Sequence, residues 1–211
     1  TPDNVRGYSN LGGVYIYLGK WSEAKEMLER SLKLKPDKAA YSSLGALYFY
    51  QEARYSDAAR IYEKALQLDV RDYRVWGSLA SAYYWAPGER AKALAAYQRA
   101  SRMAEEQLKV NPQDATVLSH LASFYAMMDD TNKAISLLEK SLSLAPSDNE
   151  VIARAGETYE QLGQREKALK WIEKALKKGY SLATLERNPA LKELRADSRF
   201  QSLIKELLHT P

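Results

Sequence analysis

Apolar and small residues recur along this chain at spacings of three and four, in paired segments that repeat about every 34 residues. The segments Tyr8–Pro36 and Leu118–Pro146 are equally long and place leucine, a small residue and tyrosine at the same offsets. Spacings of three and four put these residues on one face of a helix. The pattern therefore predicts consecutive pairs of amphipathic helices.

Five units share this pattern. Small residues occupy the positions where the two helices of a unit are expected to cross. A proline ends the first and fourth units at the same position of the repeat. The first unit supplies Tyr8, Leu11, Gly12, Tyr15, Ala24, Leu28, Ser31 and Pro36. Over residues 5 to 182 the residue types and their spacing resemble the tetratricopeptide repeat (TPR) family. These pattern positions are expected to form the core.

The resemblance implies an all-α fold: a TPR superhelical solenoid of five helix-turn-helix repeats with a C-terminal capping helical hairpin. It places the repeats at 5–38, 39–72, 73–114, 115–148 and 149–182, and the capping helices at 183–211.

The third unit departs from the period, because Pro112 arrives seven residues late. No glycine or proline lies between Glu89 and Val110, so we expect one helix of about 22 residues, after a turn lengthened by one residue. Two interpretations stay open: a longer helix that packs on its neighbours, or an arm that contacts a flanking domain or a second copy.

The closing stretch, Arg187–Pro211, does not follow the repeat. Its apolar stripe suits a cap that covers the last repeat, while a docking arm is the alternative. We expect Phe200, Leu203, Ile204, Leu207, Leu191 and Leu194 to face the fifth repeat, and Arg195, Arg199 and Lys205 to face water.

Composition narrows the function classes. The 31 lysines and arginines are interleaved with 27 aspartates and glutamates, so no nucleic-acid partner is expected. No stretch is long and apolar enough for a membrane span, and we expect a cytoplasmic protein with no membrane partner. The chain has no cysteine, and His120 and His209 are far apart, so we expect no catalytic, metal or cofactor site.

The groove of the solenoid is then the expected site. In some TPR proteins, lysines and asparagines there clamp the C-terminal carboxylate of heat-shock chaperones; the matching positions here hold Ser9, Gly13, Ser43, Arg74 and Ser78, which disfavours such a clamp. Small residues and an aromatic stripe instead favour an extended peptide or partner segment along the first four units. The predicted groove residues are Ser9, Gly13, Tyr17, Ser42, Ala46, Tyr50, Arg74, Gly77, Ser81, Tyr84, Trp85, Ser119, Ser123, Met127 and Arg154. The alternative is that the rings only pack between units.

The last 110 residues or so also resemble the TPR region of multidomain bacterial signalling proteins, through the Gly179-Tyr180-Ser181, Asn188-Pro189 and Leu194-Arg195 motifs. In those proteins a Ser/Thr kinase, an adenylate cyclase or a winged-helix regulator precedes the repeats. The resemblance implies a protein-interaction module of a larger protein, in contact with an upstream domain. A peptide-sensing regulatory domain and a self-associating scaffold are the alternatives, and the oligomeric state is left open.

Overall fold

The structure of the chain is a computed structural model that describes residues 4–209, with the side chains of Tyr17, Leu208 and His209 outside that description. The described residues form helices only and divide into two compact units, one ending at Met103 and the other beginning at Ala104. The expectation of an all-α repeat fold is confirmed. The role expected for His209 lies outside the described side chains.

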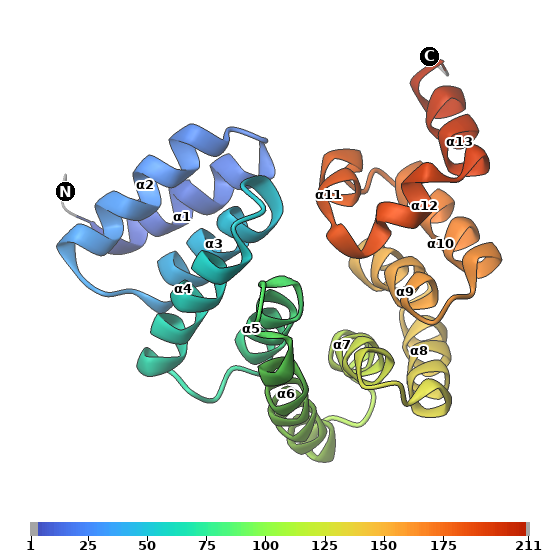
Figure 1. Cartoon of the computed structure of the whole chain (residues 1–211), viewed down its shortest axis with the longest axis horizontal. Helices are drawn as coiled ribbons and strands as arrows, with labels where there is room; N and C mark the ends of the chain where they lie inside the picture. Colours follow the sequence, from blue (N-terminus) through green and yellow to red (C-terminus); the bar gives the residue numbers. More distant parts are fainter. Residues whose placement is uncertain (1–3, 210–211) are drawn as a thin grey trace. The chain divides into compact units, whose positions relative to one another are not determined.

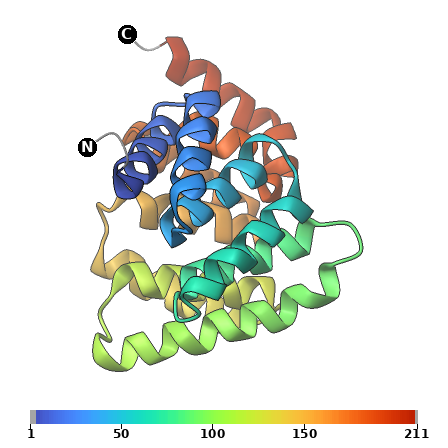
Figure 2. The ribbon, with the colours of Figure 1, turned by 90° about the vertical axis from the view of Figure 1, so that its left-hand side faces the viewer.

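Unit 1 holds three helix pairs, coloured blue to green in Figure 1. They are α1 (Val5–Tyr17) with α2 (Trp21–Leu34), α3 (Lys38–Ala46) and its continuation η1 (Leu47–Gln51) with α4 (Tyr55–Leu68), and α5 (Tyr73–Trp85) with α6 (Arg90–Val110). The expected long helix is α6, which has 21 residues and carries the boundary between the units (Figure 2).

Unit 2 holds two further pairs and the cap, coloured yellow to red in Figure 1. The pairs are α7 (Ala115–Met127) with α8 (Thr131–Leu144), and α9 (Asn149–Gln161) with α10 (Arg165–Lys177). The cap consists of α11 (Leu182–Arg187), η2 (Pro189–Leu191), α12 (Lys192–Ala196) and α13 (Ser198–His209).

The first helix of every pair begins at an asparagine or aspartate whose side chain accepts a hydrogen bond from the first turn. Such a cap satisfies one of the backbone N–H groups that a helix start leaves without a partner. The caps are Asn4, Asp37, Asp72, Asp114 and Asp148. A short polar side chain therefore fixes where each pair begins.

Small residues let the paired helices touch, as the pattern predicts. A Cβ atom on Gly45 would lie 2.7 Å from the ring of Tyr62, and one on Gly156 would lie 2.7 Å from Ile172. Contacts this short are not tolerated in packed interiors, so a larger residue would force the helices apart.

The cap continues the core of unit 2. Leu185, Leu191 and Leu194 are fully buried, and Phe200 and Ile204 pack against the same cluster as Ile152 and Ile172. These contacts are those of a cap that packs on the last repeat, and not of a free arm. The expectation that Arg195 faces water is wrong, because its guanidinium donates to the carbonyl oxygens of Leu185 and Asn188 at 3.3 and 2.6 Å.

Candidate functional site

The second pair contains one residue more than the first between its aligned core positions. Tyr48 and Ala58 are ten positions apart, whereas Tyr15 and Ala24 are nine positions apart. The extra residue is absorbed by a π-helical turn, η1, in which the N–H of Glu52 donates to the carbonyl oxygen of Leu47 at 3.3 Å. Such single-residue widenings of an α-helix occur frequently at functional sites.

Ala53 then reverses the chain. Its φ of 50° is a left-handed conformation that is uncommon for a residue with a Cβ atom. The N–H of Arg54 donates to the carbonyl oxygen of Tyr48 at 2.9 Å and closes the turn. The turn places Tyr55, the first residue of α4, with its ring centroid 5.2 Å from that of Phe49.

Five aromatic rings follow one another from η1 to the end of α5. Ring centroids lie 4.8 Å apart for Tyr50 and Phe49, 6.3 Å for Tyr55 and Trp85, and 5.4 Å for Trp85 and Tyr84. We call Tyr50, Phe49, Tyr55, Trp85 and Tyr84 the aromatic row. Edge-on and tilted pairs at these distances hold the rings in fixed positions.

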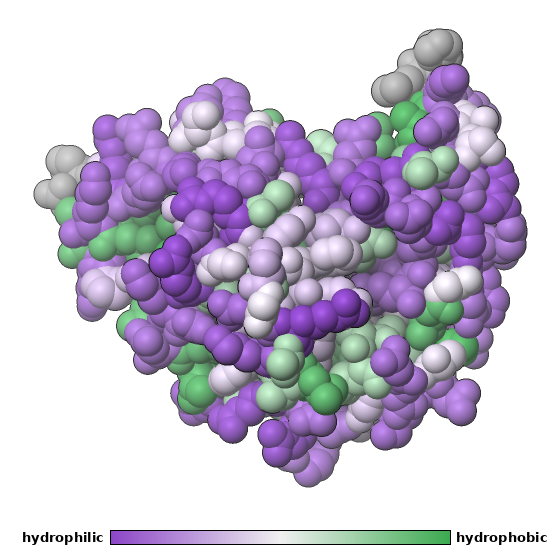
Figure 3. Space-filling model, viewed as in Figure 1, coloured by the Kyte–Doolittle hydropathy of each residue, from purple (hydrophilic) through white to green (hydrophobic). Residues whose placement is uncertain are grey.

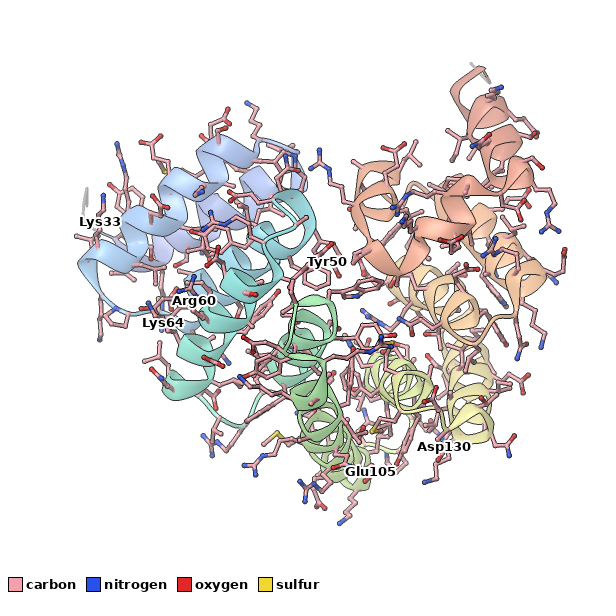
Figure 4. All side chains as sticks on the ribbon, in the orientation of Figure 1. Lys33, Tyr50, Arg60, Lys64, Glu105 and Asp130 are labelled. Carbon is pink, nitrogen blue, oxygen red and sulfur yellow. The ribbon has the colours of Figure 1, made fainter. Side chains whose placement is uncertain are left out.

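The two sides of the row differ in exposure. Phe49 is buried, whereas 37% of Tyr50 and 36% of Trp85 are exposed. Figure 4 labels Tyr50, whose ring leaves the end of η1 beside the end of α5. Figure 3 shows that hydrophobic residues form only small, separated patches on the visible face. The row thus offers rigid rings with polar tips rather than a broad aliphatic surface.

Arg90, the first residue of α6, lies at the Tyr84 end of the row. Its guanidinium carbon is 4.2 Å from the Tyr84 ring centroid, and its Nη2 donates to the Tyr84 hydroxyl at 2.5 Å. No carboxylate in the described part of the chain forms an ion pair with Arg90. Arg54, in contrast, is neutralised by Glu52 at 2.9 Å and Asp57 at 2.6 Å.

Two buried polar atoms on α3 and η1 have no hydrogen-bond partner among the described residues: Ser42 Oγ and Gln51 Oε1. Ser42, Ala46 and Tyr50 are spaced four apart and share one helix face. A buried polar atom without a partner costs free energy, so both groups lower the stability of this part of unit 1.

Other polar groups near the row are already satisfied. Ser81 and the buried Tyr97 share a hydrogen bond of 2.9 Å between their hydroxyls. Burial raises the pKa of both Tyr62 and Tyr97, so their phenols stay neutral. These tyrosines are part of the interior of unit 1.

Several predicted groove residues of unit 1 lie inside instead. Ser9 is 6% exposed, and its hydroxyl bonds to Ser31 at 2.9 Å and donates to Asp37. Gly77 is buried, and Arg74 pairs with Asp72 at 3.1 Å. Gly13 has open space around it. The side chain of Tyr17 lies outside the described residues.

The predicted residues of unit 2 do not form a comparable surface. Ser119 is 1% exposed and donates to the Thr116 carbonyl at 2.8 Å, and Ser123 donates to the His120 carbonyl at the same distance. Met127 and Arg154 are half-buried.

Next to Arg154, burial raises the pKa of the Glu157 carboxyl group, which the charge of Arg154 and a hydrogen bond from Asn188 of the cap only partly offset. This polar cluster therefore belongs to the junction of α9 with the cap.

Sequence reasoning missed Tyr55 and Arg90. The ten-residue spacing after Tyr48 was a usable signal, since it marks an insertion beside the predicted rings. Among the described residues, no cluster of histidine, aspartate or glutamate side chains could hold a metal ion, and no helix is long and apolar enough to cross a membrane.

Comparisons with known proteins agree with the repeat architecture. Family models described as tetratricopeptide repeat match residues 5–38, 73–147 and 126–197. The cytochrome c-type biogenesis protein CycH of Pseudomonas aeruginosa is 36% identical over 100 residues, which are 47% of this chain and 23% of that protein. The STIP1 homolog of Dictyostelium discoideum is 28% identical over 138 residues, 64% of this chain and 24% of that protein. The chain thus spans under a quarter of the length of these relatives.

Solved structures show the same fold. The TPR protein TTC0263 of Thermus thermophilus matches with a TM-score of 0.62 at 22% identity, over 96% of this chain and 100% of that one. PilF of Pseudomonas aeruginosa matches with a TM-score of 0.55 at 20% identity, over 96% and 97% of the two chains.

Proposed function

This chain belongs to the tetratricopeptide repeat family, whose members are protein-interaction modules, and we propose that its aromatic row binds an extended segment of a partner protein. The exposed rings of Tyr50 and Trp85 carry the proposal. Tyrosine and tryptophan are enriched among residues that dominate binding energy, because rigid rings contribute large contact area at low entropic cost.

The surface is smaller than the sequence predicts. It comprises Tyr50, Tyr55, Tyr84 and Trp85 with Ser42 and Ala46, which share a helix face with Tyr50, all within unit 1. Ser9 and Gly77 are left out because they are buried. The role is non-catalytic. The signalling-protein context and contact with an upstream domain stay predictions, on which the relatives described above have no bearing.

Site-specific photo-crosslinking tests the proposal. A benzophenone amino acid at position 85 should crosslink to a partner segment, and one at position 34 should not, although Leu34 is 46% exposed in the same unit. Trp85→Ala with Tyr50→Ala should abolish capture by a crosslinker placed at Ala46, while Leu34→Ala leaves it unchanged. Equal crosslinking from positions 85 and 34 would contradict the proposal.

A self-associating scaffold is a second candidate, since α6 exposes Leu94 and Val110 by 52% and 88%. Leu94 and Val110 are 16 positions apart and lie on nearly opposite sides of α6, so each would be a separate contact with a second copy. Light scattering that shows a dimer in the wild type and a monomer in Leu94→Glu would support it. A regulatory role in which peptide binding alters the module remains compatible with the aromatic row.

A further inference from the structure

The composition of the aromatic row restricts what can bind to it. We infer that the bound segment is proline-rich and carries acidic residues beside its prolines; this inference rests on the proposed function. The exposed rings of Tyr50 and Trp85 and the guanidinium of Arg90, which has no carboxylate partner among the described residues, carry it together.

Successive aromatic rings match the polyproline II conformation. This helix has three residues per turn and no internal hydrogen bonds, so its prolines present flat ring faces at regular intervals along one side. Pro-rich segments dock on aromatic-lined grooves because the segment is already ordered and loses little entropy on binding. In the row, consecutive ring centroids lie 4.8 to 6.3 Å apart from Tyr50 to Tyr84, and the buried Phe49 supports the more exposed rings on which prolines could stack.

The hydrogen-bonding groups of the row fit the same class of ligand. A proline run offers carbonyl oxygens but no N–H groups, so it needs donors from its receptor. The indole N–H of Trp85 is a donor carried by the row itself, and the Tyr84 hydroxyl can donate while it accepts a hydrogen bond from Arg90.

Charge favours acidic residues in the segment. Arg90 lies over Tyr84 with no carboxylate partner in the described residues, while Arg54 and Lys25 are both paired with Glu52. An exposed cation next to an aromatic surface steers and orients a segment of opposite charge. A basic segment would be repelled by Arg90, and the nearby carboxylates of Glu52 and Glu89 are already paired with cations.

Other occupants fit less well. The described part of the chain has no strand, so a partner cannot add a strand to a sheet edge. An amphipathic helix needs a groove lined by aliphatic side chains at helical spacing, whereas the face of α3 beside the row carries Ser42 and Ala46. Small residues leave room there but give little apolar contact to a helix.

Fluorescence anisotropy with the intact chain tests the inference. The probe is a labelled peptide that alternates proline pairs with glutamate, and two control peptides replace every proline by alanine or every glutamate by glutamine. Replacing the prolines should weaken binding at least about tenfold. Trp85→Ala and Tyr50→Ala should each weaken it roughly fivefold or more, while Leu34→Ala should leave it unchanged.

Arg90→Gln isolates the acidic requirement. It should weaken binding of the glutamate peptide and not of the glutamine peptide, and the comparison between peptides cancels any disturbance of Tyr84. Equal weakening of both would overturn the acidic part. Circular dichroism melting of each variant shows whether the fold is intact.

The inferred preference for proline is wrong if the alanine peptide binds as tightly as the proline peptide and Trp85→Ala weakens the binding of both. The proposed function would then stand, because an extended segment still uses the row. If neither Trp85→Ala nor Tyr50→Ala affects any peptide, the inference is wrong, and the crosslinking at position 85 decides the proposed function separately.

Discussion

Gly12 and Gly13 are neighbours in α1 with opposite surroundings. A Cβ atom on Gly12 would lie 2.6 Å from Leu28, whereas one on Gly13 would meet no described heavy atom within 4 Å apart from its chain neighbours and the backbone of its own helix. Gly12 is required because α2 approaches α1 closely there. Gly13 has no such requirement and only lowers the stability of the helix relative to alanine. Identical residues side by side therefore have different energetic roles.

Gly12→Ala is expected to lower the free energy of unfolding by about 1 to 3 kcal/mol, because Leu28 must move. Gly13→Ala should raise it by roughly 0.5 to 1 kcal/mol, since alanine favours the helix and meets nothing. Urea denaturation of both variants gives the comparison. Equal effects of the two changes would show that α1 and α2 do not pack as described.

Asp72 caps α5 and pairs with two cations, Arg74 at 3.1 Å and Lys38 at 3.2 Å. Burial alone would raise the pKa of Asp72, but the hydrogen bonds and charges of Arg74 and Lys38 outweigh it and lower the pKa to about 2. The unfolded chain has an aspartate pKa of about 3.9, so it binds the proton first as the pH falls.

The stability from Asp72 is therefore present above pH ~4 and lost as the pH falls toward about 2. Asp72→Asn keeps a capping side chain but loses the charge. We expect it to cost about 1 kcal/mol at pH 7 and to flatten the loss of stability between pH ~4 and ~2. Thermal melts across this range measure it; parallel curves for the two proteins would disprove the assignment.

At the scale of elements, α6 has seven residues more than the 14-residue helices α2, α4 and α8. Its extension carries Glu105, which accepts a hydrogen bond from Tyr125 of α7 at 2.5 Å. In unit 1, Glu63 of α4 accepts one from Tyr83 of α5 at the same distance. The extension thus repeats an interaction found between shorter helices. Burial first, and then Glu105, raise the pKa of Tyr125 to about 12.

A double-mutant cycle tests this interaction. Glu105→Ala should lower the free energy of unfolding by about 1 to 2 kcal/mol, and the loss should largely disappear when Tyr125 is already phenylalanine. The neighbouring Glu106→Ala is the matched control, because Glu106 is exposed and pairs with Lys109 of its own helix; it should change stability by less than about 0.5 kcal/mol.

At the scale of the whole molecule, ion pairs and apolar contacts both fasten the cap to the last repeat of unit 2. Arg165 of α10 pairs with Glu160 at 2.5 Å and Asp197 at 3.5 Å, and Arg199 of α13 pairs with Asp197 and Glu166. Phe200, 4% exposed, enters the core behind them.

Phe200→Ala should lower the stability of unit 2 by about 3 to 5 kcal/mol, because a buried ring leaves a cavity. The exposed neighbour Gln201→Ala should have little effect. Under conditions in which unit 1 stays folded, Phe200→Ala should leave peptide binding at the aromatic row unchanged. Unchanged melting together with loss of a partner would instead indicate a docking arm.

The repeat spacing predicted the helices and the close crossings at small residues, and the apolar stripe of the closing stretch predicted the cap. These features depend on the periodicity and the side-chain volumes of neighbouring positions in the chain. The same spacing could not show that Ser9 and Ser119 are buried, since their burial depends on neighbours such as Asp37 and on backbone acceptors that belong to no motif. Tyr55 and Arg90 join the row only through turns whose shape the pattern does not specify.

The chain contains two kinds of insertion relative to the repeat, one of seven residues and one of a single residue. The rotation per residue of the α-helix explains why the structure accommodates them differently. Seven residues make two turns to within about 20°, so α6 keeps its phase and the added residues stay helical. One residue rotates everything after it by about 100°, so it must be absorbed at once, by η1 in one pair and by the four-residue turn 86–89 in another. The aromatic row is assembled where those two out-of-phase insertions meet.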